Sequence, residues 1–209
     1  MRKNNPKGIT LIEVVVAIGI FIICIEGFTL LFVKSWKNNK YVLEMGQSSL
    51  AVSQGVGKIS EYIRKARQSD AGTYPIQSAD DNDLIIFSDY DKDGETEKVH
   101  FYYSDGNVFM GTTNPSSGFP KTYASGDEQI QIIAGSIVND PSTPIFYYFN
   151  KDYPGDQANN PISTPVSVAD IRLIKVFLKT NIDPNNAPDN IEIQTFVEVR
   201  NLNDYDKIQ

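Results

Sequence analysis

The chain has 209 residues, 41% of them apolar and 22% charged, and these ordinary proportions exclude wholesale disorder. Its 26 acidic residues outnumber 19 basic ones, which argues against a nucleic-acid partner because phosphates need a basic surface. A single cysteine, Cys24, excludes intramolecular disulfides and cysteine-clustered zinc sites. A single histidine, His100, excludes a histidine-rich metal site.

Four segments of different composition follow one another along the chain. Residues 1–8 form a basic leader without acids, and residues 9–33 contain no basic residue and 17 Leu, Ile, Val or Phe. Residues 34–67 carry seven basic and two acidic residues (net +5), whereas residues 68–209 carry nine basic and 22 acidic residues (net −13). The pattern predicts a leader, a membrane-spanning helix, a basic stalk and an acidic head.

The apolar segment, residues 9–33, is long enough to span a bilayer. At about 1.5 Å per residue it extends roughly 37 Å, more than the ~30 Å hydrocarbon core. The basic leader predicts a cytoplasmic N-terminus and an outward head, so we expect a single-pass protein of the cytoplasmic membrane. No small-x-small site follows Val33, which argues against a cleaved signal peptide. A simple anchor does not explain Glu13 so early in the apolar stretch.

The first 33 residues resemble the N-terminal segment of type IV prepilins and pseudopilins. The resemblance rests on the basic leader ending in Gly8, the following ITLIE with its Glu13, and the uninterrupted apolar run. It implies that a prepilin peptidase cuts between Gly8 and Ile9 and methylates the new Ile9 amine. It also implies that Glu13 pairs with the methylated amine of a neighbouring subunit during filament assembly.

The resemblance implies a structural filament subunit, with sister pilins or pseudopilins, an assembly platform protein and its cytoplasmic ATPase as partners. The length of the head, its strand content and its closing VRNL (199–202) resemble the larger, J-type minor pseudopilins. We therefore expect a minor subunit of a type IV pilus or a type II secretion-like filament. The alternative is a single-pass anchored binding module or adhesin. No G-x-S-x-G, H-E-x-x-H or P-loop motif indicates an enzyme.

Periodicity predicts a pilin-like α+β fold, in which a long N-terminal helix packs on an antiparallel β-sheet head. Residues 34–67 are expected to form an amphipathic helix whose apolar stripe is Met45, Val52, Val56, Ile59, Ile63 and Ala66. Strands are expected in the head (68–209) at Leu84–Ser88, Thr96–Tyr103, Asn107–Thr112, Ile145–Asn150, Ile171–Thr180 and Ile191–Val199, and residues 130–138 are expected to give one or two short strands. Residues 68–83, 113–127 and 150–166 are expected to be loops.

An acidic turn between the first two expected strands is the most chemical motif of the head. Asp89, Asp91 and Asp93, with glycine sixth and Glu95 seventh, match the opening of an EF-hand-type calcium loop. The twelfth position holds His100 in place of the bidentate glutamate. Calcium binding and a solvated acidic hairpin turn both remain open.

Two further features of the head have structural and functional readings. His100 lies in an expected strand, and without a nucleophile motif nearby we expect a structural residue in preference to a general base. The aromatic run 146–149 could form an adhesive patch, but alternation along a strand predicts that half of it belongs to the core.

Overall fold

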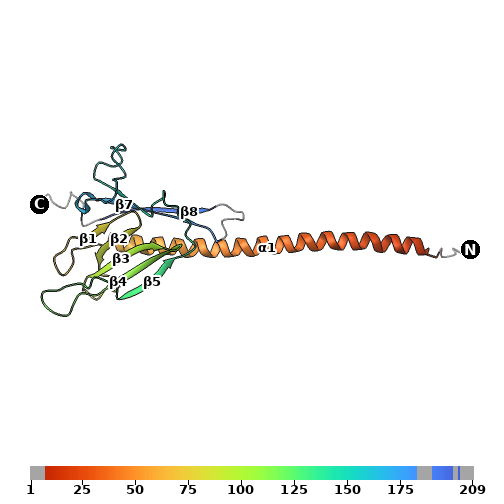
Figure 1. Cartoon of the computed structure of the whole chain (residues 1–209), viewed down its shortest axis with the longest axis horizontal. Helices are drawn as coiled ribbons and strands as arrows, with labels where there is room; N and C mark the ends of the chain where they lie inside the picture. The colour runs from red at the N-terminus through yellow and green to blue at the C-terminus, as the bar shows by residue number, and fades with distance from the viewer. Residues whose placement is uncertain (1–7, 183–189, 200–201, 203–209) are drawn as a thin grey trace, which may run out of the picture. The chain divides into compact units, whose positions relative to one another are not determined.

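The computed structural model describes residues 8–182, 190–199 and 202 of the chain. The leader up to Lys7, residues 183–189, and Arg200 and Asn201 of the VRNL segment lie outside the described residues. The chain divides into two compact units, residues 1–44 and residues 45–209. Helix α1 (Leu11–Arg64) contributes to both units (Figure 1).

In the first unit, the apolar side chains of α1 are exposed to the surroundings. Ile12, Phe21 and Leu31 are examples, with more than half of each side chain exposed. Among the described residues, α1 is the one helix long and apolar enough to cross a membrane, and none of its most apolar stretch is buried. A single apolar helix of this kind is compatible with a single-pass membrane anchor.

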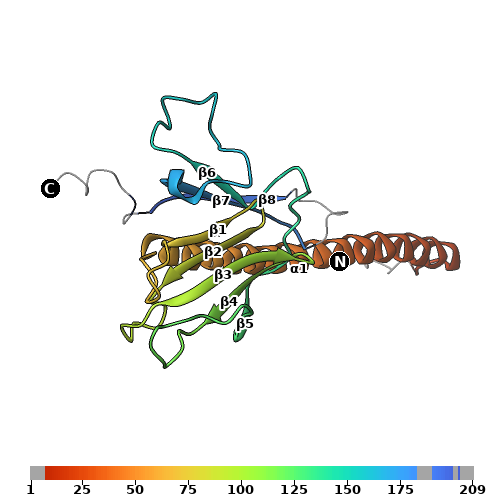
Figure 2. The same cartoon turned by 60° about the vertical axis from the view of Figure 1, so that its left-hand side comes forward.

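The head contains two antiparallel sheets. The first has the order β1-β2-β3-β4-β5, with strands β1 (Ile76–Ala79), β2 (Asp83–Ser88), β3 (Glu97–Ser104), β4 (Asn107–Thr113) and β5 (Gln129–Ala134). The second has the order β6-β7-β8, with strands β6 (Phe146–Phe149), β7 (Leu173–Thr180) and β8 (Ile191–Glu198). A short 3-10 helix, η1 (Val168–Asp170), precedes β7. Figure 2 shows the two sheets as separate layers.

One hydrophobic core joins the two sheets to the second half of α1. Val52, Val56, Ile59 and Ile63 of the helix are buried in it, as the apolar stripe predicts. Inward-facing residues alternate along β7 with half-buried ones, the expected pattern for a sheet with one side on the core. The predicted α+β class is confirmed: a long N-terminal helix packs on an antiparallel head.

The expected strands agree with the observed ones except at one place. Residues 68–83, expected to be a loop, include β1, a four-residue edge strand that is too short to show a clear alternation. Residues 130–138, expected to give one or two short strands, give β5, after which Ile137 forms an isolated bridge with Thr180.

Candidate functional site

The start of α1 is closed by a reciprocal cap between Thr10 and Glu13. The backbone N–H and the hydroxyl of Thr10 donate to Glu13 Oε2 at 2.9 and 2.8 Å, and the Glu13 N–H approaches Thr10 Oγ1 at 3.4 Å. This is a capping box, which satisfies backbone donors that the first turn of a helix leaves without partners. The sequence pattern T-x-x-E could have predicted this cap, but sequence reasoning considered Glu13 only for assembly.

The expected cleavage site lies directly before this cap. Gly8 and Ile9 are exposed, and Ile9 has 80% of its surface accessible. Apart from its chain neighbours, no described residue has an atom within 4 Å of the position that a Cβ on Gly8 would occupy. A protease can therefore approach the Gly8–Ile9 peptide bond closely, which a glycine favours because it has no side chain. Cleavage at this bond stays a prediction.

The acidic motif of the head forms the loop between β2 and β3. Gly94, at the sixth position, has a φ of +99°, a conformation that favours glycine and allows the sharp turn. Asp91 Oδ1 accepts the Asp93 N–H at 3.2 Å, and Asp93 Oδ1 accepts the Glu95 N–H at 2.8 Å. The loop is therefore ordered partly by its own carboxylates.

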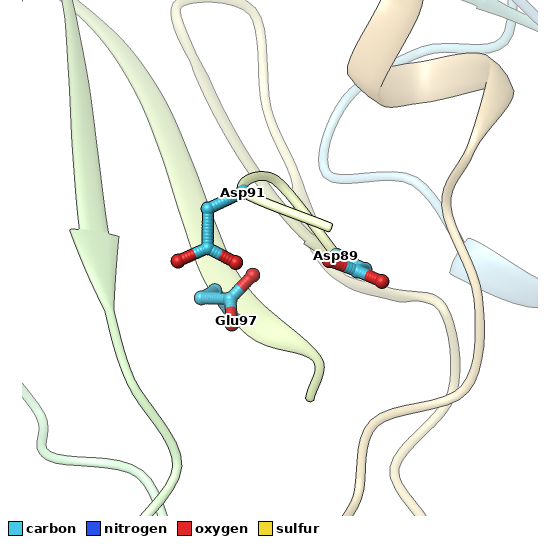
Figure 3. A group of neighbouring side chains, drawn as sticks. All are labelled: Asp89, Asp91 and Glu97. Carbon is cyan, nitrogen blue, oxygen red and sulfur yellow. The ribbon is translucent and has the colours of Figure 1, made fainter. Parts of the chain in front are cut away.

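Two carboxylates of this loop come together with one at the start of β3. Oxygens of Asp89, Asp91 and Glu97 lie within 4.8 Å of one another, and Figure 3 shows the Asp91 and Glu97 groups side by side. Glu97 is almost fully buried. Burial raises the pKa of Glu97, and the nearby Asp91 and Asp93 raise it further, against the lowering effect of a bond from the Tyr90 N–H (2.8 Å). Such a group of oxygens is chemically suited to a hard cation such as calcium.

The structure gathers a different set of residues from the four that the sequence suggested. Asp89 and Asp91 join Glu97, whereas Glu95 pairs with Lys121 at 2.8 Å. Glu97 stands at the ninth position of the motif, which in EF-hands often contributes through a water molecule. The ninth position could therefore have identified Glu97 as a candidate ligand from the sequence, but the sequence-based prediction did not include it.

Arg67, just beyond α1, already places a positive charge beside this loop. Its Nη2 lies 3.6 Å from Asp89 Oδ2 and donates to the carbonyl oxygens of Gly94 and Glu95 at 2.8 and 2.9 Å. Its Nε donates to Thr96 Oγ1 at 2.7 Å. The acidic turn is thus clamped from one side by a guanidinium. Calcium binding among Asp89, Asp91 and Glu97 stays a prediction.

His100 lies in β3 between two carboxylates. Its Nε2 is 2.7 Å from Asp83 Oδ2, and its Nδ1 is 2.9 Å from Asp127 Oδ2. Partial burial opposes protonation, but the hydrogen bonds and charges of the two aspartates outweigh it and raise the pKa of His100. Gly111, paired with His100 across β3 and β4, leaves the space that Asp127 occupies.

The aromatic run in β6 belongs mainly to the packed interior. Phe146, Tyr148 and Phe149 are buried, and the Phe149 ring is covered by Tyr153 at 4.4 Å. Only Tyr147 is partly exposed, with Lys175 Nζ 5.0 Å from its ring centroid. The run therefore contributes more to the core than alternation predicted.

Two groups of residues with distinct chemistry thus emerge: the exposed Gly8–Ile9 bond with the capped start of α1, and the carboxylates Asp89, Asp91 and Glu97 between β2 and β3. No family model matches the sequence, and no curated protein matches it. Residues and geometry alone therefore carry the functional assignment.

Proposed function

We propose that this chain is a filament-forming subunit of the type IV pilin superfamily, a minor pilin or pseudopilin. In this proposal it is stored in the cytoplasmic membrane with its head outside and is assembled after leader cleavage and N-methylation. One observation carries the proposal: an accessible Gly8–Ile9 bond stands immediately before an exposed apolar helix with Glu13 in its first turn.

The exposed apolar surface of α1 supports the proposal that this helix lies first in the bilayer and later in the core of a filament. Within the described structure no part of the chain covers residues 11–33, so lipid or neighbouring helices must do so in the cell. Cleavage before the apolar run leaves this helix attached to the head. The same helix can then anchor the subunit in the bilayer and later pack in the core of a filament.

Glu13 supports assembly as the second function of this helix. Four residues at about 1.5 Å place it roughly 6 Å beyond Ile9, where a carboxylate in an apolar setting needs a cationic partner or a proton. The methylated amine on Ile9 of a neighbouring subunit would supply the charge. The pairing would neutralise both groups and set the axial register between subunits. A prepilin peptidase, sister pilins, an assembly platform and its ATPase are the partners of this proposal.

Processing tests the proposal most directly. Mass spectrometry of the protein extracted from cells with an active prepilin peptidase should find an N-methylated Ile9 terminus. Gly8→Val should leave the precursor inserted and uncut, because the bulkier residue blocks close approach. Gly19→Val is the matched control, since Gly19 also has open space around it, and this variant should be processed normally. An intact leader on the wild-type protein would contradict the proposal.

An anchored binding module or adhesin is the second candidate. An open polar pocket of about 660 Å³ on the head favours it, with Asn159, Ser163 and Asp170 among the lining residues. The same anchor serves both candidates, but only a filament subunit leaves the membrane. Shearing surface fibres from intact cells separates them: a filament subunit is recovered with the fibres, and an anchored module stays in the membrane fraction.

A further inference from the structure

A cluster of basic and aromatic residues follows the apolar stretch of α1 directly. Lys34, Lys37 and Lys40 are all exposed, and Trp36 between them has 67% of its surface accessible. The Trp36 ring packs against the Phe32 ring one turn earlier, at 6.3 Å between centroids. We call the four residues 34, 36, 37 and 40 the collar.

The collar lies one bilayer thickness from the expected mature terminus. Twenty-seven residues separate Ile9 from Trp36, which at about 1.5 Å each gives roughly 40 Å. A bilayer with its headgroups measures ~40–45 Å. If Ile9 lies at one membrane surface, Trp36 therefore lies among the headgroups of the other. Tryptophan is enriched at this depth because its ring is apolar and its N–H is polar.

Two of the three lysines of the collar have ammonium groups that are available for an external partner. No carboxylate stands in the sequence between Glu26 and Glu44. Lys40 Nζ lies 3.6 Å from Glu44 Oε1, with both side chains largely exposed. In the part of the chain that the structure describes, neither Lys34 nor Lys37 forms an ion pair. Two unneutralised ammonium groups thus stand beside an interfacial tryptophan.

We propose that the collar binds the phosphate groups of anionic phospholipids at the outer surface of the membrane. This inference rests on the membrane insertion in the proposed function. Lys34 and Lys37 contact the headgroup phosphates, and Trp36 holds the helix at a fixed depth. The contacts keep the stored subunit at one height. Extraction into a filament must break them, so anionic lipid opposes removal from the membrane.

Trp36 provides its own probe, because it is the only tryptophan of the chain. The full-length protein is reconstituted in mixed bilayers in which either phosphatidylglycerol or phosphatidylcholine carries bromine, which quenches tryptophan fluorescence on contact. Brominated phosphatidylglycerol should quench Trp36 more strongly than its share of the bilayer predicts. The apparent preference should reach about fivefold per engaged lysine at low salt. It should shrink in 1 M salt, where charges are screened within ~3 Å.

Two double variants isolate the lysines of the collar. Lys34→Gln with Lys37→Gln should reduce the preference to near unity while Trp36 remains quenched by both lipids. Lys92→Gln with Lys151→Gln removes two exposed lysines of the head and should leave the preference unchanged. Equal quenching by the two brominated lipids in the wild-type protein overturns this proposal alone. Absence of quenching by either lipid overturns it together with membrane insertion.

Discussion

Gly55 of α1 lies so close to β5 that a Cβ atom at this position would stand 2.3 Å from the carbonyl oxygen of Ile133. A backbone oxygen held within a strand cannot move aside as the end of a flexible side chain can. The missing side chain therefore lets the helix approach the edge of the five-stranded sheet closely. At Gly57, two residues on, no other part of the described chain lies within 4 Å of the Cβ position. The two glycines share one helix, but Gly55 is buried against β5 and Gly57 is exposed.

Gly55→Ala should destabilise the head, and Gly57→Ala should stabilise it slightly. The clash at residue 55 should cost about 1–3 kcal/mol, which outweighs the gain of up to ~1 kcal/mol in helix propensity. At residue 57 only the gain of ~0.4–1 kcal/mol remains. Thermal unfolding of the full chain in detergent micelles should show melting temperatures shifted in opposite directions. Two equal upward shifts would mean that α1 does not pack on β5 as described.

Most of the fold could be predicted from hydrophobic periodicity, because a helix or strand that buries one face has apolar residues at regular spacing in the sequence. The stripe through Val52 and Ile59 predicted the packed half of α1, and alternation predicted β7. Features that depend on how closely two elements approach each other leave no such pattern. In the sequence, Gly55 is only a residue that weakens a helix; its role becomes clear in the structure, where the carbonyl of Ile133 lies beside it. The ninth motif position pointed to Glu97, but its burial beside Asp91 could not be predicted from the sequence.

His100 should make the stability of the head depend on pH. Both of its ring nitrogens can donate only when the imidazole is protonated, and they face Asp83 and Asp127. Because the folded-state pKa is raised, the stabilisation is complete below the unfolded pKa of about 6.5 and is lost as pH rises through the folded value. The melting temperature should therefore fall as pH rises through this range.

The control for this effect is His100→Gln, whose side chain does not titrate. Its melting temperature should change little between pH 6 and pH 9, apart from any slope caused by other groups. Asp127→Asn should also weaken the dependence, because the Nδ1 contact then no longer favours protonation. A wild-type profile parallel to that of His100→Gln would show that the two aspartates do not hold the proton.

The carboxylates of the β2–β3 loop give a prediction for calcium. If a cation binds among Asp89, Asp91 and Glu97, calcium should raise the melting temperature by mass action. The free energy of unfolding should increase by about 2.7 kcal/mol at a calcium concentration 100 times the dissociation constant. Glu97→Gln should abolish the response. The same substitution should not destabilise the calcium-free protein, because an amide oxygen can still accept the Tyr90 N–H and a buried charge is removed.

The Glu95→Gln variant distinguishes the observed cluster from the set of ligands that the EF-hand motif predicted, because only the predicted set includes Glu95. Glu95 pairs with Lys121 outside the cluster, so this variant should keep the calcium response. Loss of the response in Glu95→Gln, with retention in Glu97→Gln, would favour the ligands that the motif suggested. An unchanged melting temperature at millimolar calcium would leave only an acidic turn clamped by Arg67.

Glu13 caps α1 together with Thr10, and this cap provides the means to test separately the role in assembly that we propose for the Glu13 charge. A glutamine can complete a capping box as well as a glutamate, but it carries no charge. Thr10→Val removes the hydroxyl contacts of the cap and keeps the charge, at a cost of about 0.5–2 kcal/mol to the helix start. Glu13→Val removes both the cap and the charge.

If charge pairing with the methylated Ile9 amine drives assembly, Glu13→Gln should insert and be cleaved normally yet be nearly absent from sheared filaments. Glu13→Val should fail in the same way, with insertion intact or slightly improved. Thr10→Val should enter filaments at close to wild-type levels. Glu26→Val should do less damage than Glu13→Val, because 13 residues at about 100° each place Glu26 some 220° around the helix. Quantitative immunoblots of sheared and membrane fractions measure each variant. Wild-type incorporation of Glu13→Gln, together with loss of Thr10→Val, would assign Glu13 to capping and contradict charge pairing in this protein.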